Sequence, residues 1–143
     1  MKCEIFIDPT CEETVRIYVR ERTPLVEKIE ALVTAESELL MGYTDREIVP
    51  LSPAEIFCLT VEDGRVIALT AHGRLRLKER LYVLEERLGR EFLRINQSCL
   101  INVDSIERFH VSVGGALCVT LKNGFSDYIS RRQLRQVKER MGL

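Results

Sequence analysis

The 143-residue sequence has no tryptophan, only two histidines and no long run of apolar residues. Because a membrane-spanning helix needs about 20 consecutive apolar residues, we do not expect a membrane-embedded protein. No uninterrupted apolar stretch follows the first four residues, so we expect no cleaved signal peptide and a cytoplasmic location. A hydrophobic fraction of 45% beside 30% charged residues is typical of a folded soluble chain that buries a core.

Sequence motifs of common enzymes and metal sites are also missing. The five cysteines include no CxxC pair, and neither His72 nor His110 lies near a cysteine at zinc-ligand spacing. No glycine-rich phosphate loop, GxSxG or HExxH pattern occurs. We therefore expect no metal, no cofactor, no small-molecule substrate and no catalytic residue. Cys58 and Cys99 lie in apolar runs that favour burial, but a small thiol enzyme, in which one of them acts with either histidine, stays open.

The net charge of −1 averages two unlike parts of the chain. Residues 1–50 hold 6 Lys+Arg against 11 Asp+Glu, a balance of −5, whereas residues 51–143 hold 15 against 11, a balance of +4. Such asymmetry is typical of proteins with a basic surface for a polyanion, although solvated charge distributed by chance gives the same counts. The near-neutral total therefore does not exclude a nucleic-acid partner.

The first part of the chain, residues 1–45, predicts a small ββαβ accessory unit. Side chains over 3–9 and 15–20 alternate between apolar and polar, which favours two strands. A threonine N-cap followed by proline, with apolar residues at helical spacing behind it, predicts a helix over 24–36. An apolar run over 39–43 then predicts the last strand of the unit.

The second part, residues 46–143, predicts a domain made mainly of antiparallel β-strands. Four glycine-containing turn signals, at 63–64, 72–73, 114–115 and 123–124, separate short apolar runs in the manner of hairpins. Leucines at helical spacing, from Leu77 to Leu88, predict one internal helix that ends at Gly89. The fold class is therefore mainly β (α+β), with this helix and one at the C-terminus.

The C-terminal helix is predicted to begin at a capping box, Ser130-Arg131-Arg132-Gln133. Residues 131–140 hold five basic side chains against one acid. Arg131 and Arg132 lie in the first turn, where positive charge opposes the helix dipole. An approaching phosphate offsets that cost, because free N–H groups at a helix start bind anions. A solvated basic face explains the same pattern, so this helix does not decide the function alone.

A second polar cluster, Asn96-Gln97-Ser98, separates two apolar runs. Asparagine and glutamine can read adenine edges with two hydrogen bonds, and serine suits phosphate or base contacts. In an arbitrary protein, asparagine and serine at such a place more commonly cap the backbone of an ordinary loop. Asn102 precedes a predicted strand and is expected to satisfy turn amides.

Together these residues resemble the LytTR-type DNA-binding domain of bacterial transcription regulators. The resemblance covers roughly residues 48–141 and depends on an ordered set of short fragments. These are Phe92, Arg94, Gln97, Ser98, Leu100, Ile101 and Asn102, then Ile106, then Leu121, Asn123 and Gly124, and finally Ser130, Arg131 and Arg132.

The resemblance implies an elongated β domain that inserts loop side chains into successive major grooves of double-stranded DNA and bends the duplex. Carried over by motif position, the implied contacts are Arg65 at the hairpin tip 63–65, then Arg94, Asn96, Gln97 and Ser98, then Ser130, Arg131 and Arg132. The family commonly has His-Arg where this chain has Asn96-Gln97. Losing that arginine removes a strong guanine or phosphate contact, which alters the expected base preference and affinity.

The implied function is sequence-specific transcription regulation in a bacterium, by a homodimer on repeated half-sites. Family members often carry a receiver domain ahead of the DNA-binding part, for which fifty residues are too few. We therefore expect residues 1–45 to serve as a dimerisation surface, a docking site for a regulatory protein such as a membrane protein, or a structural extension. The rival interpretation is a protein–protein interaction module whose acidic N-terminal unit binds another protein.

Overall fold

The computed structural model describes residues 2–12, 14–35 and 39–143. In this part of the chain the helices are α1 (Pro24–Ala35), α2 (Leu81–Leu88) and α3 (Arg131–Met141). The strands are β1 (Leu40–Tyr43), β2 (Ile48–Leu51), β3 (Ile56–Glu62), β4 (Arg65–Thr70), β5 (Gly73–Leu77), β6 (Phe92–Asn96), β7 (Cys99–Asn102), β8 (Ile106–Val111), β9 (Leu117–Leu121) and β10 (Ser126–Tyr128). Short 3-10 turns occur at Pro53–Glu55, Gly89–Glu91 and Val103–Ser105.

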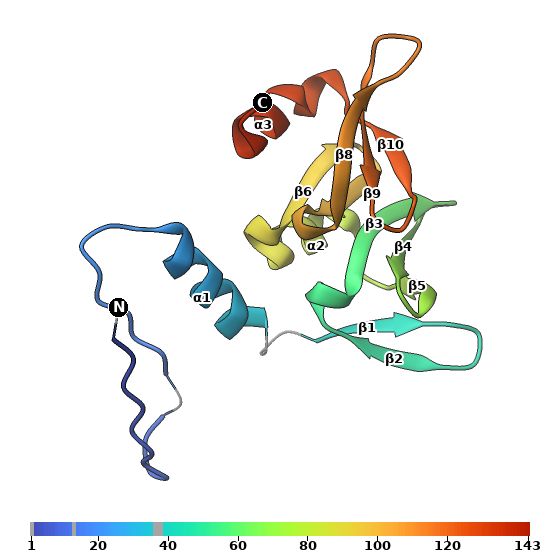
Figure 1. Ribbon diagram of the computed structural model, residues 1–143. Coiled ribbons are helices and arrows are strands. Elements are labelled where there is room, and N and C mark those ends of the chain that lie inside the picture. Colours follow the sequence, from blue (N-terminus) through green and yellow to red (C-terminus); the bar gives the residue numbers. More distant parts are fainter. Residues whose placement is uncertain (1, 13, 36–38) are drawn as a thin grey trace.

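The strands are antiparallel, as the sequence predicts, and they form two sheets (Figure 1). The larger has seven strands in the order β2-β1-β5-β4-β3-β7-β6, and the smaller has three in the order β10-β9-β8. Neighbouring strands of each sheet run antiparallel. The domain is therefore mainly β, with α2 and α3 packed against its sheets.

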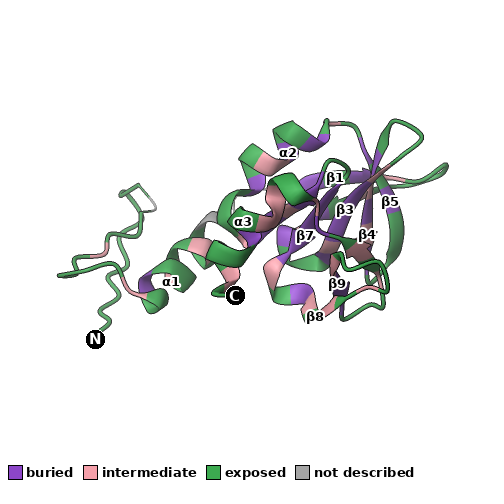
Figure 2. Ribbon diagram, turned by 90° about the horizontal axis from the view of Figure 1, so that it is seen from above, coloured by how far each residue is buried: buried purple, intermediate pink, exposed green. Residues whose placement is uncertain are grey.

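The central strands are buried on both faces because two separate cores lie on either side of them. Successive residues of β3 point in opposite directions: Leu59 joins a core with α2, whereas Cys58 joins a core with the smaller sheet and α3. Ile56 lies in the same core as Leu59 because the strand register shifts between Ile56 and Cys58. Strand β7 divides in the same way, with Leu100 in the first core and Ile101 in the second. Figure 2 shows the buried residues gathered in these strands and on the inner sides of the two helices.

Most of the predicted turns form as expected. At the tip of the β3–β4 hairpin, Asp63 and Gly64 both have positive φ angles, 50° and 74°, which is the backbone that an Asp-Gly turn favours. Helix α2 ends at Gly89 with φ 63°. The prediction is wrong for Leu77, which ends β5; the helix begins only at Leu81 because Arg80 still has an extended backbone.

Strand β1 belongs to the larger sheet rather than to a separate N-terminal unit. It pairs with β2 along its whole length and with β5 at Tyr43 and Arg76. The contact with β5 is so close that a Cβ on Gly42 would lie 2.8 Å from the Cβ of Leu75. Among the described strands, β2 pairs only with β1. The sheet therefore extends across the predicted domain boundary between residues 45 and 46.

The two strands predicted over 3–9 and 15–20 do not form. The described residues of both segments lie outside helix and strand, and they project away from the rest of the chain (Figure 1). The ββαβ unit is thus reduced to α1 followed by β1. Alternation with a period of two residues indicates which side chains share a face, but a strand also needs a hydrogen-bonded neighbour. Two strands that pair only with each other are marginally stable in water. Among the described residues, no helix is long and apolar enough to span a membrane.

Candidate nucleic-acid interface

The three loops with implied DNA contacts lie at one end of strands β3, β7 and β6. The turn between β6 and β7 is held to β3 by a hydrogen bond in which the Val61 amide donates to the Ser98 carbonyl over 2.9 Å. The start of α3 is held to β6 in the same way, because the Ser130 amide donates to the Ile95 carbonyl over 2.9 Å. The tip of the β3–β4 hairpin follows directly after Val61. Residues far apart in sequence therefore reach the same end of the sheet.

Asn96 holds the turn together from inside and is only 2% exposed. Its side-chain amide donates to the carboxylate of Asp127 over 3.0 Å and to the carbonyl of Tyr128 over 2.9 Å. Its side-chain oxygen accepts the Ser98 amide at 2.9 Å. Because these bonds occupy the amide, the geometry speaks against the implied base contact of Asn96 and gives it a structural role.

Arg94 also acts on the shape of this turn. Its Nε donates to the Asn96 carbonyl over 2.7 Å, and its Nη2 donates to the Gln97 carbonyl over 2.8 Å. Its Nη1 lies 3.5 Å from the carboxylate of Glu85 on α2 and makes no hydrogen bond with the part of the chain that the structure describes. The guanidinium thus fixes the backbone that carries the exposed side chains of Gln97 and Ser98.

A cavity of about 440 Å³ opens between this turn and the start of α3. Four residues implicated by the sequence line it, and three further residues were not predicted as site residues. The lining consists of Arg94, Gln97, Ser130 and Arg132, with Glu85, Tyr128 and Gln133. Glu85 and Tyr128 carry no local signal of a site, because only the packing of α2 and β10 brings them here.

The start of α3 presents an anion-binding geometry. The Ser130 hydroxyl oxygen accepts the Gln133 amide at 3.3 Å, which confirms the predicted N-cap. The reciprocal half of the capping box does not form, since the Ser130 amide bonds to Ile95 instead. The remaining free N–H groups and the positive end of the helix dipole favour a negatively charged group here.

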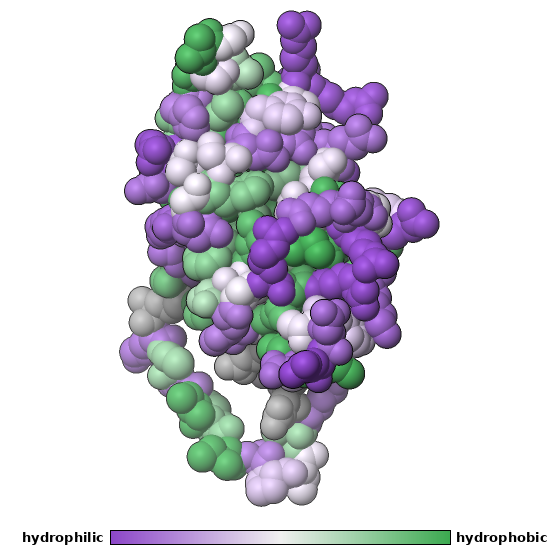
Figure 3. Space-filling view, turned by 90° about the vertical axis from the view of Figure 1, so that its right-hand side faces the viewer, coloured by the Kyte–Doolittle hydropathy of each residue, from purple (hydrophilic) through white to green (hydrophobic). Residues whose placement is uncertain are grey.

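Three arginines of the implied interface are exposed and have no ion pair with any residue that the structure describes. They are Arg65 at the hairpin tip and Arg131 and Arg132 on α3. Nearby cations differ: Arg74 pairs with Glu62 on β3, and Arg135 pairs with Glu139 at 3.2 Å. Figure 3 shows the side of the molecule to which the hairpin tip points, where hydrophilic side chains cover much of the surface.

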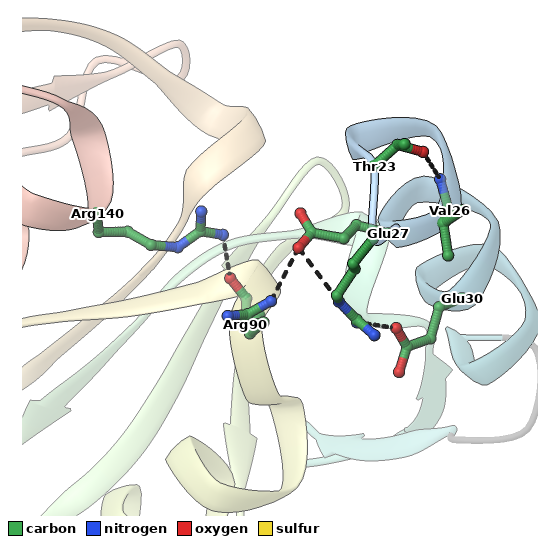
Figure 4. A network of polar contacts seen from close by, with 7 residues as sticks. Thr23, Val26, Glu27, Glu30, Arg90 and Arg140 are labelled. Atoms are coloured by element: carbon green, nitrogen blue, oxygen red, sulfur yellow. Dashed lines mark hydrogen bonds and ion pairs between the residues drawn. The ribbon is translucent and has the colours of Figure 1, made fainter. Parts of the chain in front are cut away.

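At the far end of the domain, Arg90 binds helix α1 instead. The Glu27 carboxylate lies 3.0 Å from Arg90 and 3.4 Å from Arg22, and Arg140 of α3 donates to the Arg90 carbonyl over 2.7 Å (Figure 4). Arg22 also pairs with Glu30. A cavity of about 470 Å³ lies between α1 and this part of the domain. Arg140 therefore holds the turn that carries Arg90 and does not belong to the loops at the other end.

The two buried thiols have an environment opposed to nucleophilic chemistry. Cys58 and Cys99 are both 0% exposed, and a hydrogen bond to Cys58 together with burial raises the pKa of the Cys99 thiol. A nucleophilic cysteine needs the reverse, a lowered pKa beside a base. In the described residues neither thiol is hydrogen-bonded to a histidine, and no group of three or more His, Cys, Asp or Glu residues suits a metal ion.

Comparison with known proteins agrees with this arrangement. The family model of the LytTr DNA-binding domain matches residues 46–142. The chain is a member of the LytTR family. Two relatives, from Staphylococcus aureus strains NCTC 8325 / PS 47 and COL, are described as HTH-type transcriptional regulators. Each is 30% identical to this chain over an alignment of 149 residues, which covers 100% of this chain and 99% of the relative. A LytTr DNA-binding domain from Bacillus cereus has the same fold, with a TM-score of 0.69 at 17% identity, over 73% of this chain and 97% of that one.

In this LytTR domain, α2 and α3 do not form a helix-turn-helix. Strands β6 to β10 separate the two helices in the chain. Among the described residues, these two helices therefore lack the arrangement of a recognition helix directly preceded by its supporting helix.

Proposed function

We propose that this LytTR protein is a sequence-specific transcription regulator that binds double-stranded DNA with the loops at the end of β3, β7 and β6. The observation that carries the proposal is the convergence of Gln97, Ser130 and Arg132 around one cavity, beside exposed arginines without an ion pair among the described residues. The family membership and the regulator relatives support the same conclusion.

Within this interface the residues divide by chemistry. Arg65, Arg131 and Arg132 supply charge for phosphates or guanines, and the exposed amide of Gln97 reads a base edge. Ser98 and Ser130 contact phosphate or sugar, with the free amides of α3 near the latter. Arg94 is a positioning residue, since its bonds go to the Asn96 and Gln97 carbonyls. Side chains from three adjacent loops reach successive major grooves when the duplex bends toward them.

The test begins with selection of a preferred duplex from a random pool, followed by fluorescence anisotropy at several salt concentrations. Affinity should fall steeply as salt rises, because phosphate contacts release counterions. Arg132→Ala should cost about 1–3 kcal/mol, equivalent to roughly five- to 150-fold in Kd, if the guanidinium contacts a base.

Arg135→Ala is the matched control, because it removes the same charge from the same helix but from a side chain paired with Glu139. Equal affinity of the wild-type, Arg132→Ala and Arg135→Ala proteins would remove Arg132 from the interface. Failure to enrich any sequence, with weak salt dependence, would favour the protein-interaction module instead.

A further inference from the structure

The segment before α1 exposes more apolar surface than a solvated tail needs. Ile5, Phe6 and Ile7 are 83%, 83% and 92% exposed, and Tyr18 is 89% exposed. No helix or strand of the described chain includes these residues. An uncovered cluster of large apolar side chains is typical of an interaction surface.

Two runs in this segment, residues 3–8 and 15–20, are complementary when placed antiparallel. On one face Glu4 then lies opposite Arg20, and Asp8 lies opposite Arg16, on either side of an aromatic pair. That pair is Phe6 with Tyr18. Opposite charges and aromatic pairs across neighbouring strands both stabilise antiparallel sheets.

The other face of the same pairing is apolar. Ile5 lies opposite Val19, and Ile7 lies opposite Ile17. The first run carries the acids and the second carries the bases, so two copies of either run alone repel each other, whereas unlike runs attract. The sequence therefore specifies which run pairs with which, and in which register.

Within the chain that the structure describes, this pairing has neither backbone hydrogen bonds nor ion pairs. The turn after the first run is local: the Asp8 carboxylate accepts the Thr10 amide at 3.0 Å, and the Cys11 amide donates to the Asp8 carbonyl over 3.3 Å. No backbone hydrogen bond joins the described residues of the two runs. Glu4, Arg16 and Arg20 are exposed and form no ion pair with the described residues.

We propose that residues 2–21 bind the same segment of a second copy of this chain, with run 3–8 of each copy paired to run 15–20 of the other. A two-fold axis makes both pairings equivalent, as in exchange of an element between protomers. The exchange gives two ribbons whose apolar faces can cover each other, and a single ribbon lacks that cover. A segment of about twenty residues also approaches the 20–30 residues per partner of a stable interface.

The test uses the full chain with two charge variants, measured by analytical ultracentrifugation and native mass spectrometry at micromolar concentrations. The variant Glu4→Arg with Asp8→Arg makes both runs basic, and the variant Arg16→Glu with Arg20→Glu makes both acidic. The wild-type protein should be a dimer, each variant alone should be a monomer, and their mixture should form a heterodimer. Circular dichroism checks that both variants stay folded.

Glu12→Arg is the matched control, since it changes one charge of the segment outside the two runs and should leave the dimer intact. A monomeric wild-type protein would overturn the proposal, and the exposed apolar surface would then be expected to bind a different protein. Variants that remain dimers would place the dimer contact elsewhere. Variants that are monomers alone and also when mixed would restrict any pairing to a single chain. Each of these results contradicts the proposal without affecting the DNA-binding loops.

Discussion

Asn96 and Gln97 are adjacent in the sequence but have opposite environments. Asn96 is buried and hydrogen-bonded to Asp127 and Tyr128, whereas Gln97 is exposed and lines the cavity beside α3. The sequence presents them as one polar cluster, because the partner carboxylate of Asn96 lies 31 residues further along the chain. Only the packing of β10 beside the turn separates a structural amide from one that can reach a base.

Alanine substitutions should separate these two roles. Asn96→Ala removes a buried side chain and its hydrogen bonds to three part-buried groups, so it should lower the free energy of unfolding by about 1–3 kcal/mol. Gln97→Ala removes an exposed side chain and should change stability by no more than about 0.5 kcal/mol. Urea denaturation of both variants measures the difference.

DNA binding should give the reverse order for the same pair. With each variant folded under the binding conditions, Gln97→Ala should weaken binding to the selected duplex and change its base preference. Asn96→Ala should weaken it only through the altered shape of the turn. A Gln97→Ala protein with unchanged affinity and preference would contradict base reading by Gln97.

Helix α3 combines a buried anchor with two exposed arginines of the proposed interface. Val137 is 0% exposed in the core shared with the smaller sheet, and Ser130 fixes the start of the helix against β6. This anchoring determines where Arg131 and Arg132 point. The amphipathic spacing of the sequence predicted the helix and its N-cap, because both depend on residues within one or two turns.

Two substitutions of Ser130 should distinguish helix capping from DNA contact. Ser130→Ala loses the cap to the Gln133 amide and should lower stability by about 1 kcal/mol. Ser130→Asp keeps an oxygen acceptor at the N-cap, so its stability should stay near that of the wild-type protein. Thermal unfolding followed by circular dichroism compares the two.

The aspartate should nevertheless weaken DNA binding more than the alanine does, because its negative charge stands where a phosphate would approach. Anisotropy with the selected duplex measures this order. Equal affinity of Ser130→Asp and the wild-type protein would show that no phosphate comes near the start of α3.

Elements that depend on neighbours in sequence were predictable, whereas those that depend on a distant partner were not. The hairpin at Asp63-Gly64 and the end of α2 at Gly89 follow from local backbone preference and formed as expected. The segments 3–9 and 15–20 also alternate, weakly in the first and cleanly in the second, but have no strand partner in the described chain. Alternation indicates that one face of a segment is apolar, but it does not indicate which segment, of the same chain or of another, covers that face.

At the scale of the whole molecule, helix α1 and strand β1 differ in how much they contribute to the stability of the domain. Helix α1 is held to the domain by ion pairs such as Glu27 with Arg90, whose side chains are 46% and 75% exposed. Exposed ion pairs contribute little, typically about 0–1 kcal/mol. Strand β1, by contrast, places Leu40 in the core at 1% exposure and pairs with β2 over four residues.

This difference predicts the stability of two fragments. A fragment of residues 39–143 keeps β1 and should unfold with a free energy close to that of the full chain. A fragment of residues 46–143, which starts where the family match starts, loses β1 and with it the buried Leu40. The emptied site should cost about 2–5 kcal/mol, in the range of a large core side chain cut to alanine, and β2 is left without its neighbour.

Urea denaturation of both fragments measures this cost, and equal midpoints would mean that β1 is dispensable for the sheet. DNA binding provides the internal control, because β1 lies toward the edge of the larger sheet opposite to β6. Under conditions where both fragments are folded, each should therefore bind the selected duplex with similar affinity per copy. A loss of binding by the folded 46–143 fragment would contradict the location of the interface at the end of β3, β7 and β6.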